Sequence, residues 1–185
     1  MSEVEEAPTD EDLVRACLAG QRQAFDQLVV RHQRQTYALC YRFAGNHEDA
    51  SELAQDVFVR AYRALGTFKG HAAFKTWLYR IAVNQCLNRA DKREIPVRPL
   101  DDVRSGPAPD EPADSALLRE ERAVRVRRAI ARLPEKQRAT LILRAYHDLP
   151  HEEIARVLGG SVGAAKTNLH HALKRLRAIL LNDEC

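Results

Sequence analysis

The sequence lacks any long apolar run and any segment that resembles an export signal. None of its 185 residues lies in an apolar stretch near the roughly 18 residues that a membrane-spanning helix needs. The first residues, Ser2 to Glu6, are mostly acidic, whereas a secretory leader begins with a basic segment followed by an apolar one. We therefore expect a cytoplasmic protein with no direct membrane insertion.

Motifs that carry catalysis or metal binding are also missing. The cysteines are too far apart for a CxxC pair, which makes them small core residues in a reducing compartment: Cys17, Cys40, Cys86 and Cys185. His151 and Glu152 begin an HExxH zinc pattern, but Ala155 stands where its second histidine belongs. No phosphate-binding glycine loop and no GxSxG elbow occurs. We therefore expect no metal, no cofactor and no enzymatic activity.

The charge is strongly segregated along the chain, although the net charge is only +3. Residues 1–12 form an acidic tail of charge −6, and residues 13–93 carry +7. Residues 94–115 carry −4, and residues 116–185 carry +6. Two basic blocks separated by an acidic spacer favour two surfaces that bind a polyanion, with nucleic acid as the first candidate. The spacer holds five of the eight prolines, so we expect a flexible linker there, and a merely solvated tether is an equally good interpretation.

The first block, residues 13–93, is predicted to be a helical bundle. Apolar residues recur at helical spacing from Phe25 to Phe43 and again from Ala50 to Leu65. On the second of these helices, acidic and amide residues share the arc opposite the apolar one: Glu48, Asp49, Glu52, Gln55 and Asp56. This arc suits a basic partner, although an ordinary solvated face is the simpler interpretation.

The end of the first block interleaves aromatic side chains with bases and amides. A loop with Lys69 and His71 precedes a helix that carries the following residues: Trp77, Arg80, Asn84, Asn88 and Arg89. Single-stranded nucleic acid binds such surfaces, because aromatics stack on bases, cations hold phosphates and amides contact base edges. Taken alone, Trp77 is better explained as a packing residue, since Phe74 and Ile81 lie at helical spacing from it.

The second block, residues 116–185, has the pattern of a helix-turn-helix. Pro134 and Pro150 mark helix starts, Gly159 and Gly160 end a short helix, and Ser161 is a good N-cap for a long final one. The final helix has an apolar stripe: Val162, Ala165, Leu169, Ala172, Leu173, Leu176, Ile179 and Leu180. Its other arc is basic and polar, which suits a major groove, with a solvated face as the alternative: Lys166, Thr167, His170, His171, Lys174 and Arg177.

Several stretches of the chain, in order, resemble one family. Residues 49–60, DASELAQDVFVR, are similar to the DAEDLVQEVFLR signature of group IV sigma factors, the extracytoplasmic-function (ECF) type of the sigma-70 family. The run TWLYRIAVN at 76–84 resembles the stretch that follows it in that family. Residues 133–138, 151–155 and 161–173 are similar to the family's LP..QR, YEEIA and SVGTVKSRLHRAR motifs.

The resemblance implies an all-α protein that directs core RNA polymerase to promoters. It implies a sigma domain 2 at 13–93, a linker at 94–115 and a sigma domain 4 at 116–185. Asp49, Glu52, Gln55 and Asp56 would then bind the polymerase core, a partner with β and β′ subunits, on the β′ clamp helices. The minus-ten element would be bound by the following residues: Lys69, His71, Trp77, Arg80, Asn84, Asn88 and Arg89. The minus-35 element would be recognised by another set: Lys166, Thr167, His170, His171 and Lys174.

The resemblance also implies an anti-sigma partner. Two other classes of function are suggested by the residues alone. One is a stand-alone regulator with a sensing or dimerisation domain, in which the acidic arc and the aromatic-basic loop have no task. The other is a nucleic-acid enzyme, which needs acids near DNA-binding bases, and we expect the acids to lie apart from both basic faces. We also expect the two domains to move semi-independently, so that a compact free form would itself indicate self-occlusion.

Overall fold

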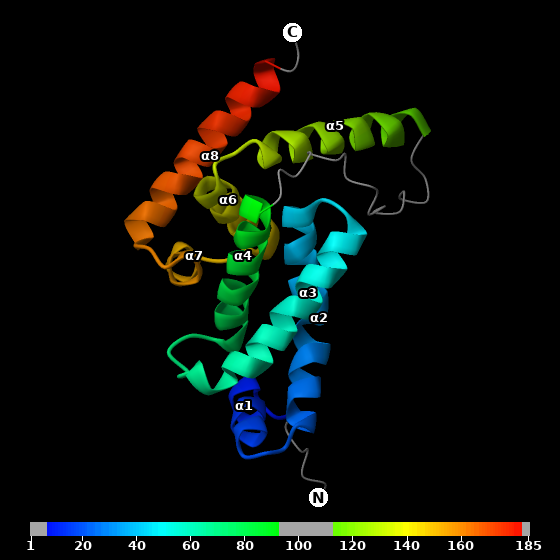
Figure 1. The fold of residues 1–185 in the computed structure, drawn as a ribbon. Helices are drawn as coiled ribbons and strands as arrows, with labels where there is room; N and C mark the ends of the chain where they lie inside the picture. Colours follow the sequence, from blue (N-terminus) through cyan, green and yellow to red (C-terminus); the bar gives the residue numbers. More distant parts are fainter. Residues whose placement is uncertain (1–6, 93–112, 183–185) are drawn as a thin grey trace, which may run out of the picture.

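The computed structural model describes the backbone of residues 7–92 and 113–182, and the side chains of residues 7–89 and 121–182. Regular structure within the described ranges is entirely helical, which confirms the predicted all-α class (Figure 1). The helices run in this order: α1 (Asp10–Leu18), α2 (Gln23–Ala44), α3 (His47–Ala64), the 3-10 turn η1 (Leu65–Thr67), α4 (Phe74–Lys92), α5 (Ala113–Ala131), α6 (Glu135–His147), α7 (His151–Leu158) and α8 (Val162–Asn182).

Helices α1 to α4 form the N-terminal unit, in which α2, α3 and α4 pack on one another. The two predicted apolar stripes are its core, since Leu28 and Leu39 of α2 and Val57 of α3 are fully buried. Gly45 ends α2 at φ 80°, a left-handed conformation that glycine adopts without steric cost. Asn46 then caps α3, because its side-chain oxygen accepts the Asp49 backbone N–H at 2.8 Å.

Helix α4 is buried over more than half of its circumference. Its buried residues fall on an arc of roughly 200° at 3.6 residues per turn, and they include the following: Phe74, Thr76, Leu78, Tyr79, Ala82, Val83 and Cys86. So wide a buried arc cannot be covered by α2 and α3 alone. The remaining cover comes from α7, which packs on α4 from the other half of the chain.

Helices α5 to α8 form the C-terminal unit and contain the predicted helix-turn-helix. Pro134 and Pro150 directly precede α6 and α7, as expected. Gly159 ends α7 at φ 66°, and the Ser161 hydroxyl accepts the Ala164 backbone N–H at 3.1 Å at the start of α8. The short helix, turn and long helix are therefore confirmed.

Four expectations need correction or restriction. Helix α5 was not predicted, because its Arg- and Glu-rich sequence gives little apolar periodicity. Leu173 was placed on the buried stripe of α8 but is 51% exposed. Three acids of the tail assigned to 1–12 belong to the first turn of α1, which Thr9 caps. Residues 1–6, most of the linker and Cys185 lie outside the described residues, whereas Cys40 and Cys86 are core residues as predicted.

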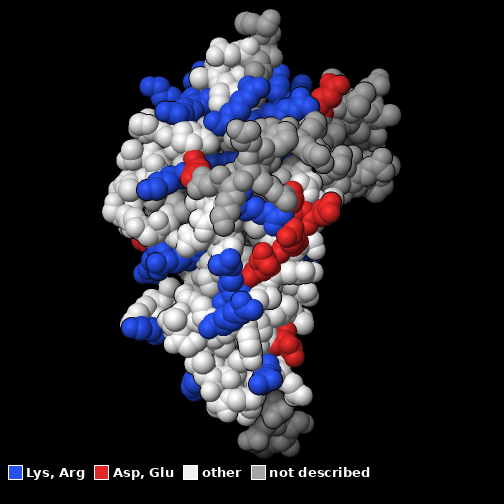
Figure 2. Space-filling view, viewed as in Figure 1, with Lys and Arg blue, Asp and Glu red and all other residues white. Residues whose placement is uncertain are grey.

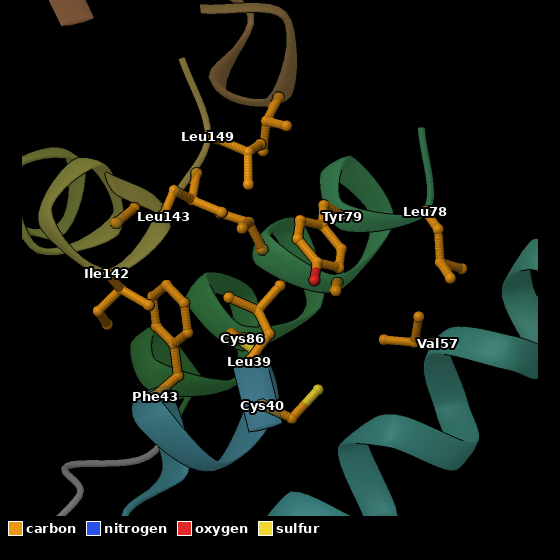
Figure 3. Packing of buried hydrophobic residues seen from close by; sticks show 14 of the residues in the cluster. Leu39, Cys40, Phe43, Val57, Leu78, Tyr79, Cys86, Ile142, Leu143 and Leu149 are labelled. Carbon is orange, nitrogen blue, oxygen red and sulfur yellow. The ribbon is translucent and has the colours of Figure 1, made fainter. Parts of the chain in front are cut away.

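The two units share one apolar core, which differs from the expected semi-independent domains. In Figure 3, Leu143 and Leu149 from the C-terminal unit lie against Tyr79, and Ile142 lies against Phe43 of α2. Tyr79, Ile142 and Leu143 are fully buried. Apolar burial therefore holds the units together.

Polar contacts also cross the boundary between the units. The Tyr79 hydroxyl and His147 Nδ1 form a 3.0 Å hydrogen bond, and Thr76 Oγ1 donates to Glu153 Oε2 at 2.9 Å. Arg138 donates to the Phe43 carbonyl at 3.0 Å while its guanidinium lies over the Phe43 ring. These contacts give the apolar interface a defined register.

The half-buried His147 makes the stability of this interface depend on pH. Burial, together with the nearby Lys75 and Arg42 cations, lowers the pKa of His147 to about 4, and Asp148 opposes this shift. The unfolded chain, with an imidazole pKa of roughly 6.5, binds more protons than the native chain between these values. His147 therefore stabilises the fold above about pH 6.5, and that contribution falls as the pH drops toward 4.

We expect His147→Gln to flatten the pH dependence of unfolding between pH 7 and 4.5. Over this range the free energy of unfolding of the unaltered protein should fall by an amount on the order of 1 kcal/mol, a value reduced because solvent still reaches the imidazole ring. The variant should not show this fall. Urea unfolding at a series of pH values measures it, with His170→Gln on the exposed face of α8 as the matched control. An unchanged pH profile for His147→Gln would refute this role.

Candidate functional site

The acidic arc lies on the outer side of α3, opposite its buried stripe. We call its four predicted polymerase-binding residues the acidic row: Asp49, Glu52, Gln55 and Asp56. Glu52, Gln55 and Asp56 are exposed, and Asp49 is half-buried at the start of the helix. There the carboxylate of Asp49 also accepts a 2.8 Å hydrogen bond from the Asn46 amide. Figure 2 shows acidic atoms in a diagonal line across the position of α3, with basic atoms close by.

Arg89 of α4 is bound to this acidic row. One of its guanidinium nitrogens lies 2.8 Å from Asp49 Oδ1 and 2.6 Å from Glu52 Oε2. The Glu52 hydrogen bond is the main cause that raises the pKa of Arg89. Only 18% of the Arg89 side chain is exposed. The expectation that the acidic residues lie apart from the basic faces is therefore wrong at this position. Arg89, which was predicted to bind DNA, joins Asp49 and Glu52, which were predicted to bind the polymerase.

The predicted minus-ten residues surround a cavity of about 670 Å³ between η1 and α4. Its lining includes five of them: Lys69, His71, Trp77, Arg80 and Asn84. Asn88 is exposed further along α4, and Arg89 faces α3 instead. The structure thus brings five of the seven residues to one cavity.

Trp77 is both a packing residue and part of the cavity wall. Its ring lies 5.6 Å from the Phe68 centroid and 5.5 Å from the Phe74 centroid, in edge-on and tilted arrangements. Phe74 is buried, while Trp77 is half-buried and lines the cavity. The aromatic cluster therefore holds one indole at the mouth of a basic cavity, where it can stack on a base.

Thr76 and Arg156 are among the lining residues of the cavity that were not predicted. Thr76 is buried and is held by Glu153, and Arg156 extends from α7 of the C-terminal unit. The TWLYRIAVN run includes Thr76, so its neighbourhood was indicated by the sequence. Nothing local marks Arg156, because it reaches the cavity only through the packing of α7 on α4.

The predicted minus-35 residues lie on the solvent side of α8. All five are exposed: Lys166, Thr167, His170, His171 and Lys174. Ala165 and Ala172 are buried on the opposite side, which packs on α6 and α7. The helix contains no acidic residue between Val162 and Asn182. An exposed basic helix following a short helix and a glycine turn has the geometry for major-groove insertion.

Comparison with known proteins identifies the family. Residues 28–94 match Sigma-70 region 2, and residues 123–176 match Sigma-70, region 4. The chain is 38% identical to the ECF RNA polymerase sigma factor SigM of Mycobacterium tuberculosis over 173 residues, which cover 93% of this chain and 85% of the relative. The chain belongs to the ECF group of sigma-70 factors. It is also 37% identical to the RNA polymerase sigma-H factor of Pseudomonas aeruginosa, over 88% of this chain and 89% of that one.

Solved structures share the fold of this ECF sigma factor. CnrH, solved in complex with the cytosolic domain of CnrY, superimposes with a TM-score of 0.70 at 27% identity, covering 94% of this chain and 98% of CnrH. RpoE of Bartonella quintana, solved with the anti-sigma factor NepR, gives a TM-score of 0.63 at 23% identity, over 84% and 96% of the two chains. The second likeness shows the fold alone.

The family settles the class of function. This ECF sigma factor is a transcription initiation factor that directs RNA polymerase to specific promoters, and it is not an enzyme. The stand-alone regulator is not favoured, because the first block matches region 2 rather than a sensing domain. Within the described residues, no group of three or more metal-binding side chains comes together, and no helix is long and apolar enough to cross a bilayer.

We expect Arg89→Ala to lower the free energy of unfolding of the sigma factor by about 1–2 kcal/mol. The substitution leaves the Asp49 and Glu52 carboxylates close together without the guanidinium that now bridges them. Urea unfolding at low and high NaCl measures the change, and the deficit should shrink as salt screens the repulsion. Arg60→Ala, an exposed site on α3, is the matched control and should cost less than about 0.5 kcal/mol. A deficit that is equal for both variants would contradict the bridging role.

Proposed function

We propose that the acidic row binds the basic clamp helices of the β′ subunit of core RNA polymerase. Glu52, Gln55 and Asp56 project from one face of a regular helix into solvent, so a basic helix can approach them without rearrangement of the fold. Arg89 partly neutralises Asp49 and Glu52, which limits repulsion within the row until a partner arrives.

The cavity between η1 and α4 binds the melted minus-ten element. Extrusion of a base from the duplex costs a few kcal/mol, which stacking and contacts inside a pocket must offset. Trp77 supplies the stacking surface, while Lys69 and Arg80 supply charge for the phosphates. Asn84 adds an amide that can contact a base edge.

Helix α8 recognises the minus-35 element in duplex form. The observation that supports this role is that all five predicted minus-35 residues are exposed, on the side of α8 opposite the buried Ala165 and Ala172. Lys166 and Lys174 bind phosphates, and Thr167, His170 and His171 contact base edges. The described segments exclude most of the 94–115 linker, which we propose to thread toward the polymerase active centre.

An anti-sigma factor is the further protein partner that we propose. It is supported by CnrH, solved with the cytosolic domain of CnrY, and by RpoE, solved with the anti-sigma factor NepR. We propose a cytoplasmic location, because core polymerase and promoter DNA are found there.

The first experiment mixes the full chain with bacterial core RNA polymerase that lacks any sigma factor and separates the products by gel filtration at moderate salt. We expect a stoichiometric complex. Separate elution of a folded, duplex-binding chain would sink the proposal that this chain docks on the polymerase core.

Charge reversal on the acidic row should weaken this complex. We expect Asp56→Arg to raise the dissociation constant for core polymerase at least about tenfold, since it opposes the basic clamp helices at an exposed position. Asp26→Arg changes the charge equally at an exposed site on α2 and is the control. Equal affinities of the two variants would place the docking surface elsewhere.

Removal of basic residues from α8 should weaken DNA binding and spare polymerase binding, the opposite of the effect expected for the acidic row. We expect Lys166→Ala with His170→Ala to weaken promoter-duplex binding about tenfold or more while leaving core-polymerase binding intact. Loss of the Lys166 phosphate contact should also reduce the slope of log affinity against log salt by about 1. Fluorescence anisotropy across a salt series measures both effects. An unaltered slope and affinity would show that α8 does not contact the duplex.

A further inference from the structure

Helix α1 lies outside the part of the chain that matches Sigma-70 region 2, which begins at residue 28. It nevertheless packs on α2 and on η1, the 3-10 turn that borders the proposed minus-ten cavity (Figure 1). Thr9 caps the start of α1, and its first residue, Asp10, contacts two residues of α2. These contacts lead from α1 to the wall of the cavity.

The Asp10 carboxylate holds the imidazole of His32. Its Oδ2 lies 2.7 Å from His32 Nε2, and its Oδ1 accepts a 3.1 Å hydrogen bond from Arg31. A carboxylate can only accept, so the His32 Nε2–H is the donor. The place of Asp10 in the first turn of α1 favours its negative charge, because the helix dipole is positive there. The bond therefore keeps a proton on Nε2 and fixes the orientation of the ring.

The His32 side chain is buried between Asp10 and the start of α4. It is 9% exposed, and its ring centroid lies 5.3 Å from that of Phe74. A buried polar group that loses its partner costs free energy, because water does not replace the lost bond. Removal of the Asp10 acceptor would therefore drive the imidazole toward solvent and away from Phe74.

Phe74 connects this pair to the cavity. It is the first residue of α4 and is 1% exposed. Its ring centroid is 5.7 Å from that of Phe68 and 5.5 Å from that of Trp77, and both of these residues line the cavity. Four side chains in contact thus join α1 to the indole that we propose to stack on a base: Asp10, His32, Phe74 and Trp77.

The same rings close the loop that carries two of the proposed DNA-binding residues. Phe68 and Phe74 flank residues 69–73, and their contact brings the two ends of this loop together. Lys69 and His71 of the loop line the cavity. A shift of Phe74 would therefore displace the stacking surface and the basic side of the cavity together. Binding sites need their side chains held within about 0.5 Å of the productive geometry.

We propose that Asp10 and His32 are positioning residues of the minus-ten site, which hold Phe74 in place and so orient Trp77 and the 69–73 loop for the melted strand. This inference rests on the minus-ten role proposed above. It makes α1 part of the DNA-binding unit, although none of the described residues of the cavity wall comes from α1.

Asp10→Ala tests the pair in the full chain, with Trp77 as the reporter because it is the only tryptophan. We expect the acrylamide quenching constant of Trp77 to rise about twofold or more, since the packing around the indole loosens. Asp10→Asn keeps an oxygen acceptor for His32 and should restore the wild-type constant. Arg31→Ala removes the other partner of Asp10 at an exposed site and should also match the wild type.

The functional readout is the binding of single-stranded DNA by each variant in complex with core polymerase. The probe is a set of single-stranded oligonucleotides selected from a random pool by the wild-type complex and counter-selected against core polymerase alone. We expect Asp10→Ala to weaken their retention about fivefold or more, the loss that follows when one base stacks poorly. Binding of core polymerase itself should not change, because the acidic row lies on α3.

His32→Phe is a second variant, which keeps a ring against Phe74 and removes the bond to Asp10. It should weaken retention as Asp10→Ala does. The double variant should bind no more weakly than the more affected single variant, since both changes break one bond. Far-UV circular dichroism identifies the variants that keep their helices, and if Asp10→Ala does not, His32→Phe decides. Wild-type quenching and retention in a helical single variant, or additive losses in the double variant, would overturn the proposal.

Trp77→Ala separates this inference from the function on which it rests. Unchanged retention by Trp77→Ala would count against the cavity as the minus-ten site, and quenching in Asp10→Ala would still decide whether the pair positions Trp77. Lost retention in Trp77→Ala together with wild-type retention in Asp10→Ala would overturn the positioning role and leave the minus-ten role standing.

Discussion

The architecture depends on the need to cover α4 over more than half of its circumference. Its buried residues span roughly 200° of the helix, from Phe74 through Leu78 to Tyr79 and Val83. A helix of that kind is unstable beside water, and α2 and α3 can shield only part of it. The C-terminal unit completes the shield, so the same helix supplies the wall of the proposed minus-ten cavity and the base of the contact between units (Figures 1 and 3).

Charged residues on α3 and α4 also take part in more than one contact. The acidic row faces solvent on α3, yet its first two carboxylates share the Arg89 guanidinium. An arginine that is held by two acids retains little reach toward DNA, so α4 is divided along its length. Its first turns, with Thr76, Trp77 and Arg80, belong to the cavity, and its later turns support the row.

Local features of the fold were predictable from the sequence, whereas contacts between distant segments were not. Apolar periodicity indicated α2, α3 and α8, and Pro150, Gly159 and Ser161 marked the helix-turn-helix, because caps and turns act over a few residues. Periodicity tells which side chains are buried but not against which partner. The Tyr79–His147 hydrogen bond joins residues 68 positions apart, and the Arg89 bridge joins residues 40 and 37 positions apart. No local sequence pattern predicts either contact. The exposure of Leu173 has the same origin, since the described helices that pack on α8 leave about half of its side chain uncovered.

The shared core has a consequence for the chain while it is being made. Tyr79 leaves the ribosome 70 residues before Leu149, the residue that helps to cover it. At 5–20 residues per second, translation leaves the outer face of α4 uncovered for roughly 4–14 s. During that interval the nascent N-terminal half presents an apolar strip next to a basic cavity, a combination that chaperones and binding partners can capture before the second half of the protein exists.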